Sequence, residues 1–248
     1  MNMKKNSIIA LLLAFLVVPV KGQLTKNVWQ ECNKNGDVVL PSEGMHQGHN
    51  YVDLGLSVKW ATVNVGAAKP EGIGNYYMWG HTYTTSDYKW ETYKHCYYQS
   101  ASKIYMKKYL IVEETGGWAV DNLSRLERKD DVAATSWGGN WRIPTPAEVQ
   151  ELIVYCDWKY TTLNGVKGYW ITSRKEGYTQ NGIFLPLTGC MLGTSCILPD
   201  MFGYIWTSEL YGDGNQNAYG LRINYSGSYY LGSFPRYEGF PIRPVLDL

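Results

Sequence analysis

The sequence lacks the short motifs that mark the common hydrolases and transferases. It contains no G-x-S-x-G, H-E-x-x-H or C-x-x-C pattern and no phosphate-binding glycine loop. It also lacks a strong charge of either sign, because 23 Lys and Arg residues stand against 22 Asp and Glu residues, a formal net charge of +1. A basic nucleic-acid-binding surface is therefore not expected. The sequence leaves open whether folding brings together a pair of catalytic carboxylates, for which Glu113 and Asp131 are examples.

Long apolar runs are absent except at the start of the chain. The run Ile8–Val20 follows Lys4 and Lys5 and precedes Lys21 and Gly22. This arrangement is typical of a secretory signal peptide over residues 1–22, and the run is too short to span a bilayer comfortably. Cleavage removes these lysines and changes the net charge from +1 to −2. We therefore expect an exported protein in the periplasm, on the cell surface or secreted, with no membrane span after cleavage.

Leucine-periodic helices are also scarce, whereas aromatic residues and glycine are abundant, with 21 Tyr, 10 Trp and 26 Gly. This composition favours strands and loops that pack through large rings. Removal of the signal peptide leaves 248 − 22 = 226 residues, the size of one domain. Residues 23–50 show little periodicity and are interpreted as a linker or strap. Residues 51–248 are interpreted as the domain.

One stretch, Trp137–Cys156, combines several structural signals. Its paired glycines indicate a tight turn, because glycine reaches positive φ without steric cost. The segment T-P-A-E from Thr145 to Glu148 is a capping box with proline at the first helical position. The apolar residues that follow recur at helical spacing: Val149, Leu152, Ile153 and Cys156. The pattern predicts an amphipathic helix with Cys156 as a buried free thiol.

The remaining pattern predicts an α+β domain with a second short helix over 126–136 and a run of antiparallel strands. The predicted strands after the capped helix lie at 167–172, 182–187, 204–208, 218–225 and 228–231. The last piece, 240–245, contains two prolines and is expected to be an edge or terminal strand. Residues 81–122 form a long excursion rich in tyrosine and tryptophan, interpreted as binding loops or as rings that cover the core.

Metal and cofactor binding are not expected. The pair His46 and His49 has no acidic or thiol partner nearby in the sequence and is interpreted as part of a solvated tail. Asp130 and Asp131 stand near the start of the predicted second helix, where the helix dipole accounts for acidic residues without calcium.

The five cysteines leave at least one thiol unpaired within the chain. The stretch Cys190–Cys196 has the pattern of a strand, a glycine-containing turn and a second strand. It therefore predicts a cross-strand disulfide between Cys190 and Cys196. The fates of Cys32 and Cys96 stay open. Cys32 lies too far from the cleavage point for lipid attachment.

Several blocks of the sequence resemble one family. They are Y-V-D-L-G-L-S-V-K-W-A-T-V-N-V-G-A from Tyr51, N-Y-Y-M-W-G from Asn75, W-G-G-N-W-R-I-P-T from Trp137, N-G-I-F-L-P-L-T-G from Asn181, G-Y-I-W-T-S from Gly203 and G-F-P-I-R-P-V from Gly239. In this order they resemble the Fibrobacter succinogenes major paralogous (FISUMP) domain. The resemblance implies a C-type-lectin-like fold, similar to that of formylglycine-generating enzymes. It also implies pairing of the first and last strands, with Val52–Leu54 beside Ile242–Val245.

The chain departs from the family pattern at three points. His81 follows the W-G dipeptide, where the family commonly has Glu. Leu110 follows the K-Y pair, where the family often has a cysteine, and this difference leaves Cys96 without its usual disulfide partner. The calcium-binding tripeptides of animal C-type lectins are absent, so the resemblance does not imply calcium-dependent sugar binding. No general catalytic activity is attached to the family.

The sequence is best interpreted as an exported, non-catalytic binding or adhesion module for a protein or a glycan. The alternatives are an oxidase like the formylglycine-generating enzymes that uses Cys190 and Cys196, and a structural subunit of a surface assembly. The segment Tyr211–Tyr237 is rich in Tyr, Asn, Ser and Gly, as antibody loops are. Within it Tyr219, Leu221 and Ile223 are expected in the core. The predicted contact set is Asn215, Asn217, Tyr229, Tyr230, Arg236 and Tyr237.

Overall fold

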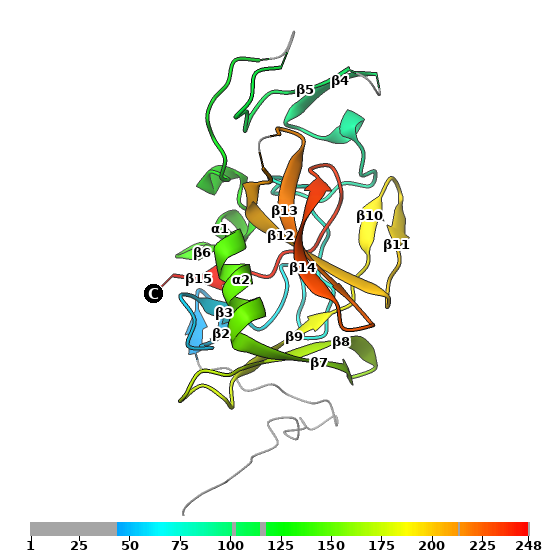
Figure 1. Cartoon of the computed structure of the whole chain (residues 1–248). Coiled ribbons are helices and arrows are strands. Elements are labelled where there is room, and N and C mark those ends of the chain that lie inside the picture. Colours follow the sequence, from blue (N-terminus) through cyan, green and yellow to red (C-terminus); the bar gives the residue numbers. More distant parts are fainter. Residues whose placement is uncertain (1–43, 101–102, 115–117, 213, 248) are drawn as a thin grey trace, which may run out of the picture.

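The computed structural model describes residues 44–100, 103–114, 118–212 and 214–247. The predicted signal peptide, Cys32 and most of the predicted linker lie outside these residues. The described chain is mostly antiparallel strands with two short helices, α1 (Val132–Trp137) and α2 (Pro146–Tyr155), which confirms the α+β prediction at that level (Figure 1). The strands are β1 (Gly44–His46), β2 (His49–Val52), β3 (Lys59–Ala61), β4 (Cys96–Ser100), β5 (Lys103–Met106), β6 (Trp141–Arg142), β7 (Cys156–Leu163), β8 (Val166–Ser173), β9 (Gly182–Pro186), β10 (Cys190–Leu192), β11 (Ser195–Ile197), β12 (Phe202–Leu210), β13 (Asn217–Asn224), β14 (Tyr229–Pro235) and β15 (Val245–Leu246).

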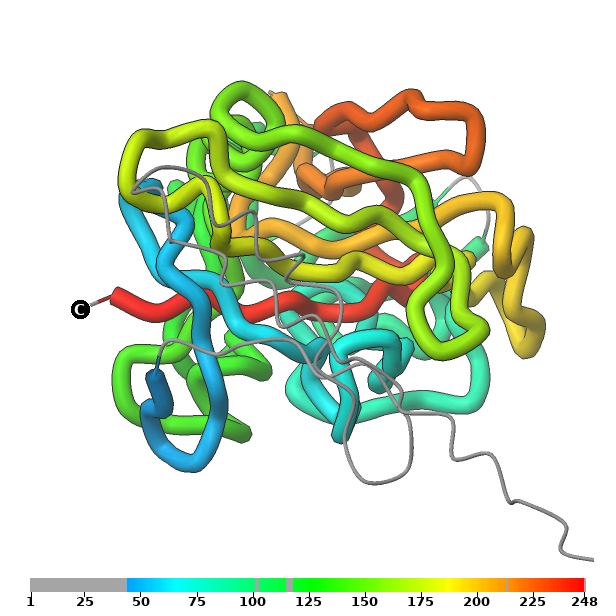
Figure 2. Tube along the Cα trace, turned by 90° about the horizontal axis from the view of Figure 1, so that it is seen from below, coloured from blue at the N-terminus to red at the C-terminus, as the bar shows by residue number. Residues whose placement is uncertain are grey.

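The C-terminal strand lies inside a sheet with the order β1-β2-β3-β15-β6. The strand predicted over 240–245 is therefore not at an edge; it is the last strand of the described chain and covers only Val245–Leu246. Figure 2 shows the C-terminal segment beside the N-terminal strands. Pro241 and Pro244 do not interrupt the pairing of β15 with its neighbours, because both lie before β15 and take part in backbone hydrogen bonds only as acceptors. The Pro244 carbonyl accepts from Ala61 N at 2.9 Å, and the Pro241 carbonyl accepts from Trp206 N at 3.2 Å.

The partner of the last strand also differs from the one that the family resemblance implies. Val245 pairs with Trp60 of β3, and the Ile242 carbonyl accepts from Val65 N at 2.9 Å. Residues 242–245 therefore run along 60–65, not along Val52–Leu54. Strand β2 is one position further out in the same sheet, because β3 pairs with both β2 and β15.

Residues 44–50 belong to the sheet, so the linker interpretation is wrong for this part of 23–50. Strands β1 and β2 form a hairpin that covers the two tryptophans of the W-G-G-N-W stretch. The His49 ring stacks on Trp137 at 3.7 Å and 6°, and Trp141 Nε1 donates to the His46 carbonyl at 3.0 Å. A Cβ atom at Gly139 would collide with the His46 ring, so this glycine is needed for the close approach.

Helix α2 confirms the prediction from the capping box. The Thr145 hydroxyl accepts from Glu148 N at 3.2 Å, and Glu148 Oε2 accepts from Thr145 N at 2.8 Å. Val149 and Leu152 are buried against the sheets β12-β13-β14 and β7-β8-β9, together with Cys156. Cys156 is a buried free thiol, as expected, and it starts strand β7.

The predicted helix over 126–136 is two shorter pieces. A 3-10 turn, η3 (Arg128–Asp130), is followed by α1, whose N-cap is Asp131. The predicted strands correspond to β8, β9, β12, β13 and the start of β14. Tyr219 is only half-buried, contrary to the prediction. Both faces of β13 are covered, so the buried residues include Ala218 and Gly220 as well as Leu221 and Ile223.

The excursion 81–122 forms a lobe of its own, with hairpin β4–β5 and a 3-10 turn, η2 (Trp90–Thr92). Figure 1 shows the hairpin at the end of the molecule opposite to strands β7–β9. The lobe has a small core that includes Tyr88, Tyr93, Met106 and Leu110. Tyr88, Tyr93 and Tyr109 are buried, whereas Tyr83, Tyr97 and Trp118 are exposed and the other tyrosine and tryptophan rings of the excursion are half-buried.

Candidate functional site

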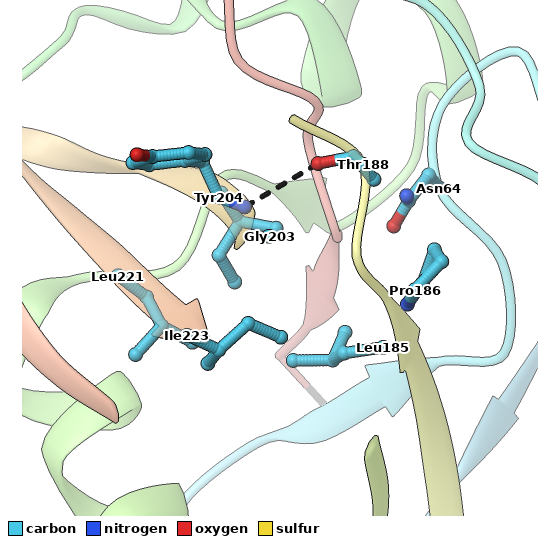
Figure 3. A pocket seen from close by; sticks show the side chains of 9 residues that line it. Asn64, Leu185, Pro186, Thr188, Gly203, Tyr204, Leu221 and Ile223 are labelled. Carbon is cyan, nitrogen blue, oxygen red and sulfur yellow. Dashed lines mark hydrogen bonds between the residues drawn. The ribbon is translucent and has the colours of Figure 1, made fainter. Parts of the chain in front are cut away.

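Three places in the described part of the chain are candidates for a ligand, namely an interior cavity and two surface pockets. The interior cavity lies between β9 and the β12-β13 strands, where the Thr188 hydroxyl accepts from Tyr204 N at 3.3 Å (Figure 3). Its volume is about 10 Å³, which is room for no more than one water molecule. It cannot hold a ligand.

The better candidate is a surface pocket of about 420 Å³ between the 81–122 lobe and the β10–β11 turn. This volume is within the range of small-ligand sites, on the order of 300–1,000 Å³. We call it the aromatic pocket. Its lining residues are Tyr88, Lys89, Trp90, Glu91, Tyr98, Ile104, Leu192, Gly193 and Tyr237.

Backbone hydrogen bonds hold the two sides of the aromatic pocket together. Tyr88 N donates to the Gly193 carbonyl at 2.8 Å, and Gly193 N donates to the Tyr88 carbonyl at 2.9 Å. The Thr92 hydroxyl closes the turn that carries Trp90 by donating to the Asp87 carbonyl at 2.6 Å. The turn that carries Trp90 and Glu91 is therefore fixed before any ligand arrives.

The rings of Trp90 and Tyr237 meet at a corner of the pocket. Their centroids are 4.9 Å apart and their planes make an angle of 61°. Both side chains are half-buried, so each ring keeps a surface toward solvent. Tyr88 is almost fully buried, and its hydroxyl donates to the Tyr76 carbonyl at 3.0 Å. Tyr88 therefore forms the floor, whereas Trp90 and Tyr237 form walls that a ligand can touch.

The two charged side chains that line the aromatic pocket, Lys89 and Glu91, each have a polar partner close by. Lys89 Nζ lies 2.5 Å from Asp87 Oδ2, and this contact raises the pKa of Lys89. The pKa of Tyr98 is also raised, first by burial and then by the Glu91 carboxylate, to which the Tyr98 hydroxyl is hydrogen-bonded. The pocket thus combines apolar rings with one ammonium donor and one carboxylate acceptor, and it has no excess of cationic groups.

A buried arginine positions the wall formed by Tyr237. Arg236 is fully buried and donates to the Tyr93 hydroxyl at 2.8 Å and to the Asn215 carbonyl at 2.6 Å. It also donates to the Lys108 carbonyl at 3.0 Å. Because these acceptors lie on both the lobe and the body of the domain, Arg236 fastens one to the other beside the pocket.

The six predicted contact residues do not form one surface. Arg236 is fully buried, so its prediction as a ligand contact is wrong. Asn215 and Asn217 both line a second surface pocket of about 430 Å³. Asn215 is mostly covered there, and its Oδ1 accepts from Ile111 N at 2.8 Å and from Val112 N at 3.1 Å. Only Tyr237 lies in the aromatic pocket.

The other two predicted residues lie on strand β14. Tyr229 stacks on Trp158 of β7 at 4.4 Å and 13°, a packing contact between two sheets. Tyr230 is exposed, and its hydroxyl accepts from Arg222 at 2.9 Å. Sequence reasoning missed Trp90, Glu91 and Tyr98 as members of a site. The available signal was the density of aromatic residues between 81 and 122.

The histidines and acidic residues weighed as metal ligands have other roles. No group of three His, Cys, Asp or Glu side chains suited to a metal ion occurs within the described residues. The buried Asp131 carboxylate caps α1 through Ala134 N at 3.0 Å and accepts from Ile143 N at 2.8 Å. Burial acts to raise the pKa of Asp130, but hydrogen bonds from Lys108, Lys94 and Tyr109 hold it below its usual value.

The predicted disulfide between Cys190 and Cys196 is not formed. The β10–β11 hairpin is present as predicted, but Cys190 pairs with Ile197 and Cys196 pairs with Met191. A one-residue offset sends neighbouring side chains to opposite faces of a hairpin. Cys190 is accordingly buried and Cys196 exposed, both as free thiols. The oxidase alternative would need these two thiols on one face.

Native thiol labelling tests this arrangement. We expect a maleimide to label Cys196 in the folded protein and to spare Cys96, Cys156 and Cys190. The thiolate is the reactive form, and burial raises the pKa of Cys96 to about 11 and that of Cys156 and Cys190 to about 12. Peptide mass spectrometry of a Cys32→Ser variant reads the result. A peptide in which Cys190 and Cys196 are disulfide-linked, or equal labelling of the two, would contradict it.

No protein-family profile, curated protein or solved structure matches the chain. None of the helices in the described part of the chain is long and apolar enough to cross a membrane.

Proposed function

We propose that this chain is an exported, non-catalytic binding or adhesion module with a C-type-lectin-like fold. Its ligand is a protein or a glycan, and the aromatic pocket is the place of contact. The observation that carries the proposal is the corner formed by the half-exposed rings of Trp90 and Tyr237. It lies beside the polar side chains of Lys89 and Glu91 in a pocket of about 420 Å³. Rings that are held in place before binding lose little entropy when a ligand arrives.

Three further features support a binding role. The residues around the pocket are held by backbone hydrogen bonds and by Arg236, as expected of a preorganised site. The loop-rich lobe 81–122 supplies most of the lining, and binding residues are commonly carried on loops over a rigid scaffold. The signal-peptide pattern of residues 1–22 agrees with action outside the cytoplasm.

Substitution of the half-exposed tryptophan in the pocket, Trp90, tests the proposal. A Trp90→Ala variant is expected to lose at least about tenfold in affinity for a ligand found by screening the wild-type protein on glycan and protein arrays. Trp118→Ala is the matched control, because Trp118 is exposed and pairs with Tyr97 outside the pocket. Thermal melting of both variants verifies that the fold is retained. Unchanged affinity in Trp90→Ala and in Tyr237→Ala would place the site elsewhere.

A further inference from the structure

The aromatic pocket has a chemical character that narrows its ligand class. We infer that it binds an uncharged sugar unit of a glycan, stacked on the rings of Trp90 and Tyr237, without a bridging metal ion. This inference rests on the proposed function of the same pocket. It concerns what the pocket recognises, and it can fail while the binding role stands.

The pocket presents a mixture of apolar and polar surfaces that suits a sugar. A pyranose has an apolar face of C–H groups and a rim of hydroxyls that both donate and accept hydrogen bonds. Trp90 and Tyr237 offer ring surfaces at 61° to each other, with Ile104 and Leu192 adding aliphatic contact. Lys89 offers a donor and Glu91 an acceptor at the same pocket. A purely apolar peptide side chain would form no hydrogen bond with Lys89 or Glu91.

The charges around the pocket do not favour an anionic ligand. Binding of a phosphate, sulfate or uronate needs an excess of cationic donors, most effectively an accessible guanidinium. Here the single ammonium, Lys89, is already paired with Asp87 at 2.5 Å, and Glu91 adds a negative charge. Arg236, the neighbour of Tyr237, is fully buried and donates to protein acceptors. An anionic ligand would therefore meet repulsion from Glu91 with no free cation to offset it.

The pocket has too few acidic groups for calcium. Calcium bridges a sugar to a protein when several oxygen ligands converge on the ion. Glu91 is the carboxylate of the lining, and the nearby Asp87 is engaged by Lys89. The remaining lining residues contribute no carboxylate. Recognition is therefore expected through direct hydrogen bonds and stacking, and it should survive a chelator.

A glycan array that compares neutral and anionic oligosaccharides of the same length tests the inference. The wild-type protein is applied to neutral oligosaccharides of hexose and N-acetylhexosamine units and to uronate and sulfated oligosaccharides of the same length, with and without EDTA. We expect binding to neutral glycans that EDTA does not change and that is at least about tenfold stronger than binding to the anionic set. Trp90→Ala should lower it by at least about tenfold, and Glu91→Gln by several-fold, whereas Trp118→Ala should leave it unchanged.

Each other outcome is decisive. Stronger binding to the anionic set, or loss of binding with EDTA, overturns the inference about ligand class. Binding of a protein partner that requires Trp90, with no glycan bound, overturns it as well but leaves the pocket as the functional site. Glycan binding that is indifferent to Trp90 and Tyr237, in variants with the wild-type melting temperature, overturns the assignment of the pocket itself.

Discussion

Replacement of Arg236 by methionine is expected to lower the free energy of unfolding by about 3 to 5 kcal/mol. The guanidinium donates to four acceptors, namely the Tyr93 hydroxyl at 2.8 Å and the carbonyls of Asn215, Lys108 and Tyr109 at 2.6, 3.0 and 3.4 Å. Methionine fills much of the volume and avoids burying a charge, which offsets part of the loss. It leaves several buried acceptors without a donor, and that cost dominates.

Aromatic rings add to this stabilisation. The guanidinium carbon lies 4.8 Å from the ring centre of Trp79 and 5.2 Å from that of Tyr93, within cation–π range. Arg236→Lys should therefore rescue little of the loss, because an ammonium cannot reproduce the planar set of donors.

Urea unfolding followed by tryptophan fluorescence measures the effect. Arg174→Met is the control, because Arg174 is exposed and its ion pair with Asp157 spans 3.7 Å in solvent. The control should change the free energy by no more than about 0.5 kcal/mol. If Arg236→Met matched this control, the lobe 81–122 would be held by other contacts than those of Arg236.

The second large effect is expected at Arg243, which crosslinks the chain end to two earlier segments. Arg243 is fully buried and donates to Asn64 Oδ1 at 2.8 Å, to the carbonyls of Ala61 and Thr62 at 3.2 Å each, and to the Phe184 carbonyl at 2.9 Å. Burial lowers the pKa of Arg243 to about 9, so the side chain is still charged at neutral pH. Arg243→Met should cost about 3 to 5 kcal/mol, again because buried acceptors lose their donors.

A double-mutant cycle separates this crosslink from general packing. Asn64 is fully buried and its amide also donates to the Ile73 carbonyl at 2.9 Å. Arg243→Met and Asn64→Ala should be non-additive by at least about 1 kcal/mol, because they break a shared hydrogen bond. Urea unfolding of the wild type, both single variants and the double variant gives the coupling energy. Additive losses would show that the two residues act independently.

Short-range features of the fold could be predicted from the sequence. The start of α2 was predictable because Thr145 and Glu148 satisfy each other's backbone N–H groups within four residues. The β10–β11 hairpin was predictable for a similar reason, since a glycine-containing turn joins two short strands over seven residues. The burial of Cys156 was predicted from helical spacing, although Cys156 itself is the first residue of strand β7.

The pairing of Cys190 and Cys196 could not be predicted from the local sequence. The pattern around Cys190 and Cys196 specifies a hairpin but not its register, and a shift of one residue exchanges the faces of every side chain. The register depends on contacts outside the hairpin, such as the pairing of Met191 with Gly239 and of Tyr88 with Gly193. Those partners lie tens of residues away in the chain.

The candidate site was beyond sequence reasoning for the same physical reason. Arg236 and Tyr237 are neighbours in a Tyr- and Gly-rich stretch, yet the charged Arg236 is buried among carbonyl groups and Tyr237 lines a pocket. By itself the sequence determined the capped helix, the strand-rich composition and the turns, because these depend on groups a few bonds apart. Only the tertiary structure decided which aromatic rings remain accessible, because distant segments must first pack before the exposed surface is defined.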